Sequence, residues 1–134
     1  MSKYHNIPTI VDGIRFASKK EARRYQELKL LERVGEISDL ELQPSFTFPF
    51  QYSADIPSGV MGNPVRTEFL RYPSGRAVKY VADFTYLEVS DHAIINGEKH
   101  YTMIVEDVKG IQTPVFKLKA ALMQAVHGIK VRIT

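Results

Sequence analysis

Two helix-start signals constrain what this 134-residue chain can fold into, because they lie on either side of a long β-rich segment. Ser18-Lys19-Lys20-Glu21 has Ser and Glu at the spacing of a capping box, and apolar side chains recur along residues 22–34. Thr113-Pro114 places a capping residue before a proline at the first helical position. We therefore predict one helix at about 18–34 and a second that ends at Gly128.

The segments outside these helices read as strands. An Asp-Gly dipeptide inside residues 9–16 predicts a small hairpin, and Asn96-Gly97 predicts a tight turn in a longer one. Strand patterns occupy residues 37–52, with a bend at Gln43-Pro44, and residues 68–72, 77–89, 100–108 and 129–133. Residues 53–67 lack periodicity and predict one long loop, which is either functional or a plain excursion. The order predicts a single domain, 1–134, of mixed α/β or α+β class, with a central mixed sheet flanked by helices.

Composition excludes several classes of protein. The chain has no Cys, so disulfides, thiolate zinc sites and Cys nucleophiles are excluded, and the four His show no ligand spacing. Neither a phosphate-binding loop nor a dinucleotide fingerprint occurs. No apolar run approaches a membrane span and no signal peptide is visible, so we expect a cytoplasmic protein without a membrane partner. The net charge of +3 permits a nucleic-acid partner without demanding one.

Charged residues in two of the predicted strands point to chemistry. Asp107 and Lys109 share one face of their strand and emerge side by side after an apolar stretch. Asp83 interrupts the apolar sequence Tyr80-Val81-Ala82-Asp83-Phe84, where an uncompensated carboxylate would be costly. Two carboxylates on adjacent strands can hold Mg²⁺, and the lysine can stabilise phosphoryl charge or hold an attacking water.

Four stretches carry a resemblance to a known family: Ser18–Tyr25, Leu42-Gln43-Pro44, Tyr80–Phe84 and Val105–Gly110. In this order they resemble the PD-(D/E)XK nuclease superfamily, and more narrowly a group of small phage-encoded proteins. They are also similar to transposon-end endonucleases and small archaeal Holliday-junction resolvases. The resemblance covers most of the chain and implies a core of order α-β-β-β-α-β. The position before the first carboxylate departs from the superfamily name, because Ala82 stands where Pro would be.

The resemblance assigns roles to particular residues. It implies that Asp83, Asp107 and the backbone carbonyl of Val108 hold Mg²⁺, with Mn²⁺ able to substitute. Glu21 would reach the metal directly or through water, and Lys109 would be the catalytic lysine. Because Glu106 precedes Asp107, the second ligand could shift by one residue, but only Asp107 lies on the face of Lys109. Cations expected to contact DNA are Lys19, Lys20, Arg23, Arg24 and Lys117.

Plainer interpretations stand beside these roles. Glu21 is also explained as the capping-box acid, Asp107 and Lys109 as an exposed ion pair, and Lys117 as part of a solvated helix face. The cations at the first helix start oppose the helix dipole, which favours a phosphate nearby.

The resemblance implies a metal-dependent DNA endonuclease, selective for branched DNA, in phage or prophage recombination within a bacterial host. Two matched cuts in a junction would need a symmetric homodimer, for which Phe46, Phe48, Phe50 and Tyr52 offer an apolar face or else a buried cluster. The alternatives are an inactive nucleic-acid adaptor with the same fold, a structural phage protein, and a general nickase or transposon-end nuclease. DNA is preferred over RNA because no strand carries an aromatic RNA-binding motif.

The carboxylate pairing depends on strand register. A plain two-residue turn at Asn96-Gly97 would put Asp83 on the face of Glu106 and not of Asp107. The predicted site therefore requires one extra residue in this hairpin, either in a three-residue loop or in a bulge near Ser90-Asp91.

Overall fold

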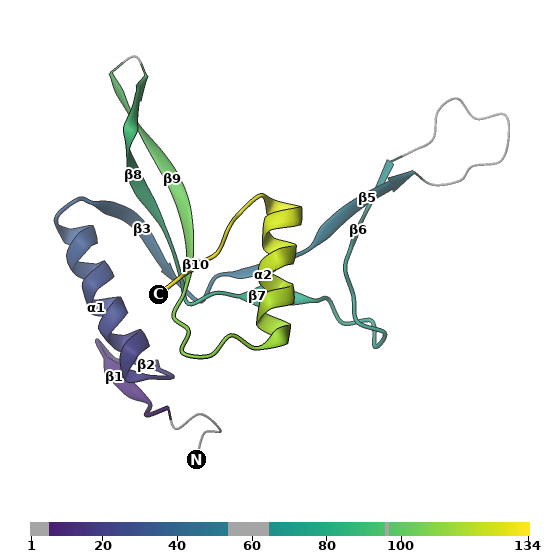
Figure 1. Ribbon diagram of the computed structural model, residues 1–134, viewed down its shortest axis with the longest axis horizontal. Coiled ribbons are helices and arrows are strands. Elements are labelled where there is room, and N and C mark those ends of the chain that lie inside the picture. The colour runs from purple at the N-terminus through teal and green to yellow at the C-terminus, as the bar shows by residue number, and fades with distance from the viewer. Residues whose placement is uncertain (1–5, 54–64, 96) are drawn as a thin grey trace, which may run out of the picture. The chain divides into compact units, whose positions relative to one another are not determined.

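The computed structural model describes residues 6–53, 65–95 and 97–134, and they form a mixed α/β structure with two helices (Figure 1). The chain divides into two compact units. The first unit combines Met1–Pro44, Ala82–Ile111 and Val131–Thr134, and the second combines Ser45–Val81 and Gln112–Lys130. The predicted mixed class is confirmed, whereas the single domain stays a prediction.

The elements of the first unit are β1 (Thr9–Val11), β2 (Ile14–Phe16), α1 (Lys19–Arg33), β3 (Ile37–Leu42), β8 (Phe84–Ile95), β9 (Glu98–Asp107) and β10 (Arg132–Ile133). Its main sheet has the order β10-β9-β8-β3. The pairs β3–β8 and β8–β9 are antiparallel, whereas β10 runs parallel to β9. The predicted hairpin at residues 9–16 is confirmed as β1–β2.

Helix α1 begins where the capping signal predicted, since Ser18 is the N-cap and its side chain accepts a hydrogen bond from the Glu21 amide. The helix buries Ala22, Tyr25 and Leu28 in the core of the first unit, where Tyr25 also packs on Phe16. From the sheet, Ile37 of β3 and Phe84 and Tyr86 of β8 enter the same core. This core holds α1 on the sheet face that carries the even-numbered residues of β8.

The second unit contains α2 (Pro114–His127) and two ribbons, β4 (Ser45–Thr47) with β7 (Lys79–Val81) and β5 (Pro49–Ser53) with β6 (Val65–Phe69). Thr113 caps α2 and Gly128 ends it in the left-handed conformation, as the sequence predicted. The His127 ring lies 2.6 Å from the Thr47 carbonyl, a hydrogen bond that ties α2 to β4.

Four features differ from the sequence prediction. The strand expected at 77–89 is broken at Ala82-Asp83 into β7 and β8, because its two halves pair with different partners, β4 and β3. Residues 65–67 of the predicted loop, together with Ser53, are strand residues, and residues 54–64 lie outside the described residues. The strand expected at 68–72 is shifted to β6, and the last strand is reduced to Arg132–Ile133.

The register of the long hairpin contains an irregularity at the predicted place, but with three extra residues where one was predicted. Ile95 pairs with Glu98 at the turn, but further along Ser90 pairs with His100, and the register shifts between Ser90 and Ile94. Four steps along β8 there match one step along β9, so β8 holds three extra residues. An odd number of extra residues exchanges the two faces of a strand relative to its partner. The shifted register continues to the pair of Phe84 with Glu106 at the start of β8.

Candidate active site

The shifted register brings Asp83 and Asp107 together at the end of the β8–β9 ladder. Asp83 directly precedes the pair Phe84–Glu106, and its amide donates to the Glu106 carbonyl at 3.2 Å. Its carbonyl accepts from the amide of Gln43 at 2.9 Å. Backbone bonds on both sides therefore fix the position of Asp83 at the break between β7 and β8.

The two carboxyl groups influence each other's ionisation. Burial first, and then the side-chain bond to Asp107, raise the pKa of Asp83 to about 7, although the Val108 amide donates to its carboxylate at 2.7 Å and opposes this change. Two carboxylates held this close cannot both ionise without a cost, so Asp83 loses its proton less readily than an exposed aspartate does.

Lys109 and Glu21 complete this group of charges. The Lys109 ammonium lies 3.2 Å from Oδ1 of Asp107, and the Asp107 side chain is 1% exposed, so this is not the exposed surface pair of the plainer interpretation. Burial and the charge of Asp107 raise the pKa of Glu21, against a hydrogen bond from the backbone at Ala17 and the charge of Lys109. We call Glu21, Asp83, Asp107 and Lys109 the acidic site.

The position of Glu21 bears on its two alternative roles. The amide of Glu21 donates to Ser18, which is one half of the capping box. The carboxylate of Glu21 is buried and feels the charge of Asp107, so it belongs to the surroundings of the acidic site. The same carboxylate also accepts a hydrogen bond from the backbone at Ala17, before the helix start, so the local role and the electrostatic role involve the same group.

Glu106, the alternative second ligand, is engaged elsewhere. Its carboxylate accepts two hydrogen bonds from Arg24, at 2.7 and 2.9 Å, and one from the Tyr86 hydroxyl at 2.7 Å. Burial alone would raise the pKa of Glu106, but these donors outweigh it and lower the pKa. Glu106 thus belongs to a satisfied structural ion pair, which leaves Asp107 as the carboxylate that meets Asp83.

The predicted DNA-contacting cations fall into different surroundings. Arg24 is bound to Glu106, and Lys20 donates to the backbone oxygens of Thr134 at 3.0 Å and Lys109 at 3.4 Å. Lys19 and Arg23 are exposed on α1. Lys117 is exposed on α2, which belongs to the second unit.

The donor set of the acidic site can be compared with what a metal ion requires. Carboxylate oxygens suit Mg²⁺, which is commonly bound by one or two carboxylates and keeps several waters. Asp83 and Asp107 supply such a pair. A bound cation would lower the raised pKa of Asp83, because it favours the ionised carboxylate. Within residues 6–53, 65–95 and 97–134, no three His, Asp or Glu side chains are assembled as a complete metal cluster. The chemistry of the pair fits Mg²⁺ with waters, and does not fit a metal that needs a closed protein cage.

Sequence reasoning missed two contributors to this site. The Val108 amide contacts Asp83, whereas the resemblance assigned a role to the Val108 carbonyl. The backbone at Thr134, next to β10, binds both the Lys109 amide and the Lys20 side chain. Only the parallel pairing of β10 with β9 could have indicated this second contact.

Comparison with known proteins identifies the family. The family profile described as "Protein of unknown function (DUF1064)" matches residues 1–133, so the chain belongs to this family. No curated protein and no solved structure matches the chain significantly. In the described part of the chain, neither helix combines the length and the apolar character needed to cross a membrane.

Proposed function

We propose that this protein is a metal-dependent DNA endonuclease of the PD-(D/E)XK type, selective for branched DNA. The observation that carries the proposal is the grouping of the Asp83 and Asp107 carboxyl groups, with Lys109 3.2 Å from Asp107 and the Val108 amide 2.7 Å from Asp83. Perturbed carboxylates beside a lysine are typical of functional sites, because they cost stability that an ordinary structural cluster would recover.

The topology supports the proposal. In chain order the elements α1, β3, β8, β9, α2 and β10 follow the α-β-β-β-α-β order that the resemblance implies. Three strands are antiparallel and the last is parallel to β9, which agrees with the mixed sheet expected for this superfamily.

The acidic site suggests a division of work among its residues. Asp83 and Asp107 would hold Mg²⁺, or Mn²⁺ in its place, and the Val108 amide orients the Asp83 carboxylate. When bound, the ion would supply positive charge to the scissile phosphate. The Lys109 ammonium, one-third exposed, can donate to a phosphate oxygen or to the attacking water. Glu21, whose pKa is raised by burial and by the charge of Asp107, would assist from the start of α1.

A cleavage assay tests this function. A synthetic four-way junction and a linear duplex of the same length are incubated with the protein in Mg²⁺, in Mn²⁺ and in EDTA. We expect paired cuts in the junction that require the metal, with light scattering showing a homodimer. Equal nicking of junction and linear duplex by a monomer would leave a general nickase, and metal-independent cutting would refute the assignment of the acidic site.

A second candidate function is an inactive nucleic-acid adaptor with the same fold. It is favoured by the finding that the described residues hold no assembled three-residue metal cluster. An adaptor would bind the junction with the same salt dependence in Mg²⁺ and in EDTA, and would cut neither substrate.

A further inference from the structure

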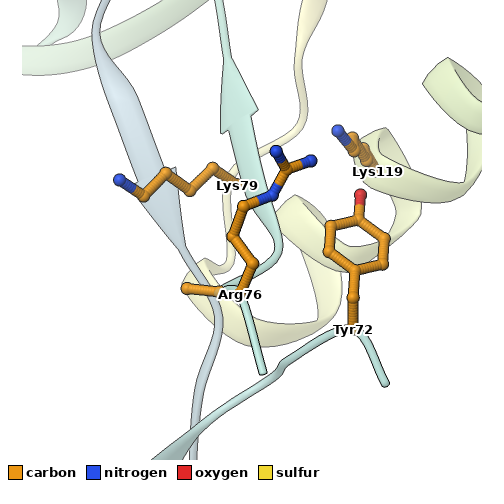
Figure 2. A pocket seen from close by; sticks show the side chains of 5 residues that line it. Tyr72, Arg76, Lys79 and Lys119 are labelled. Atoms are coloured by element: carbon orange, nitrogen blue, oxygen red, sulfur yellow. The ribbon is translucent and has the colours of Figure 1, made fainter. Parts of the chain in front are cut away.

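The second unit contains a basic pocket that the acidic site does not explain. The pocket has a volume of about 250 Å³ and is lined by Tyr72, Arg76, Ala77, Lys79 and Lys119 (Figure 2). Figure 2 shows the Arg76 guanidinium, the Tyr72 hydroxyl and the Lys119 ammonium pointing toward one another, while Lys79 extends to the other side of Arg76. The lining therefore offers cationic and hydroxyl donors and includes no carboxylate.

Arg76 is presented by a well-defined turn. The Tyr72 amide donates to the Arg76 carbonyl at 2.9 Å, and the Gly75 amide donates to the Tyr72 carbonyl at 2.8 Å. Gly75 has a φ of 91°, a conformation that other residues rarely adopt, and its carbonyl accepts from the Arg71 side chain. The Arg76 guanidinium lies 5.7 Å from the centre of the Tyr72 ring, a cation–π contact that orients it further.

Lys119 reaches the same pocket from α2. The helix packs on β7 through the rings of Phe116 and Tyr80, whose centres are 6.3 Å apart. Lys119 is partly buried, whereas Lys117, two residues earlier on the helix, is exposed. The packing of α2 thus turns Lys119, and not Lys117, toward Arg76.

Two cations that face one small pocket repel each other, and an anion between them converts this repulsion into attraction. In the described part of the chain, none of the ion pairs involves Arg76, Lys79 or Lys119. A planar guanidinium, an ammonium and a hydroxyl are the donors that commonly bind phosphate oxygens.

We infer that this pocket binds a phosphate group of a DNA strand, through Arg76, Lys119 and the Tyr72 hydroxyl. The identity of the polyanion rests on the proposed function, because the pocket itself specifies only a phosphate. The pocket gives the second unit its own contact with the substrate. It also assigns the DNA contact on α2 to Lys119 in place of the predicted Lys117.

The test compares two double variants that remove the same charges from the same unit. Arg76→Gln/Lys119→Gln empties the pocket of its converging cations. Arg66→Gln/Lys130→Gln is the matched control, since both residues are exposed in the second unit and neither lines the pocket. The affinity for a fluorescein-labelled four-way junction is measured by anisotropy in EDTA over a range of salt concentrations, after circular dichroism melting shows that each variant is folded.

We expect the pocket variant to bind the junction about 10- to 100-fold more weakly than wild type, because it loses two charge-assisted hydrogen bonds. The slope of log affinity against log salt should fall by about 1, because one phosphate contact is removed. The control variant should bind within about threefold of wild type, as expected for charges that only contribute to the general field. Equal affinities of the two double variants would overturn the inference.

A second pair of probes identifies which phosphate is bound. Single strands with a 5′-phosphate and with a 5′-hydroxyl are compared for wild type and for the pocket variant. A preference of wild type for the 5′-phosphate that disappears in the pocket variant identifies a terminal phosphate. Equal binding of both strands, with equal loss in the pocket variant, identifies an internal phosphate.

Cleavage in Mg²⁺ separates failure of this inference from failure of the proposed function. If wild type cuts DNA and the pocket variant binds like the control, the pocket is not a phosphate site and the nuclease proposal stands. If binding depends on the pocket but no cutting occurs, the phosphate site stands and the adaptor function replaces the nuclease. If wild type neither binds nor cuts DNA, both proposals are wrong.

Discussion

Glu106 and Asp107 are consecutive residues at the end of β9, and both are buried, with 0% and 1% of their surfaces exposed. Glu106 points to α1 and accepts hydrogen bonds from Arg24 of α1 and from the Tyr86 hydroxyl of β8. Asp107 points to the opposite face of the strand, where it meets the carboxyl group of Asp83. Strand alternation alone separates the two residues, because successive side chains leave a strand on opposite sides.

The consequences for protonation are opposite. The donors around Glu106 lower its pKa, whereas burial and the second carboxyl group raise the pKa of Asp83. A buried carboxylate with a full set of donors contributes to the fold, whereas two neighbouring carboxyl groups lose stability when both ionise. Burial of an acid therefore does not identify a functional residue, whereas the groups that surround the buried acid do.

The largest difference between Glu106 and Asp107 should appear when each acid is replaced by its amide. Asp107→Asn should reduce junction cleavage by about 10²–10³-fold, since it removes the charge that would hold the ion, and should leave DNA affinity in EDTA intact or improved. Asp83→Asn should do the same. Glu106→Gln should retain cleavage once corrected for the folded fraction, and full activity of Asp107→Asn would show that the acidic site has been misassigned.

Lys109 and Glu21 should contribute unequally to cleavage. Lys109→Ala should lower turnover by about 10²-fold while Mg²⁺ still protects the protein from thermal unfolding, because the lysine acts on phosphate or water. Glu21→Gln should cost less, since its amide still caps α1 through Ser18. Single-turnover cleavage and a melt with and without Mg²⁺ measure both effects. A larger loss for Glu21→Gln than for Lys109→Ala would reverse the assigned roles.

The free energy of unfolding should depend more on Glu106 than on Asp107, the reverse of their effects on cleavage. Glu106→Gln should lower the free energy of unfolding by about 1.5–3 kcal/mol, because Arg24 loses a charged partner beside the core. Asp107→Asn should be neutral or stabilising in EDTA, because it removes repulsion with Asp83. Urea unfolding measures both, and a greater loss of stability in Asp107→Asn would mean that the pair is structural.

The smallest expected effect is a pH dependence in metal-free buffer. Asp83 has a folded pKa of about 7, above its ordinary value of 3.8, so its contribution to stability is fully present below 3.8 and is lost as the pH rises through 7. The melting temperature of wild type should therefore fall between about pH 5 and about pH 8, and that of Asp83→Asn should fall less. Glu106 does not contribute to the change in this pH range. Its pKa is lowered, so its contribution to stability is lost only on acidification below 4.5.

Magnesium provides the control for the pH experiment. A cation held by Asp83 and Asp107 binds the ionised pair, so Mg²⁺ should raise the melting temperature more at about pH 8 than at about pH 5. A pH profile of wild type that matches Asp83→Asn, with no response to Mg²⁺, would contradict the interaction between Asp83 and Asp107.

The sequence alone predicted the helix ends and the faces of single strands, because both depend on residues close together in the chain. Ser18 and Thr113 begin their helices and Gly128 ends the second, because capping depends on residues a few positions apart. Face alternation along one strand also placed Asp107 and Lys109 together, and the requirement for a hairpin irregularity near Ser90 followed from parity alone.

The tertiary structure decided what depends on a distant partner. The pattern at 77–89 is that of one continuous strand, yet pairing with β4 on one side and β3 on the other breaks it at Asp83. Three extra residues in β8 set the register that brings Asp83 to Asp107, and no local signal counts them. Arg24 bonds to Glu106, and Lys119 lines the basic pocket, because packing of each helix selects which of its neighbouring cations faces inward. Local propensities act over a few residues, whereas register and packing are settled by contacts between segments far apart in the chain.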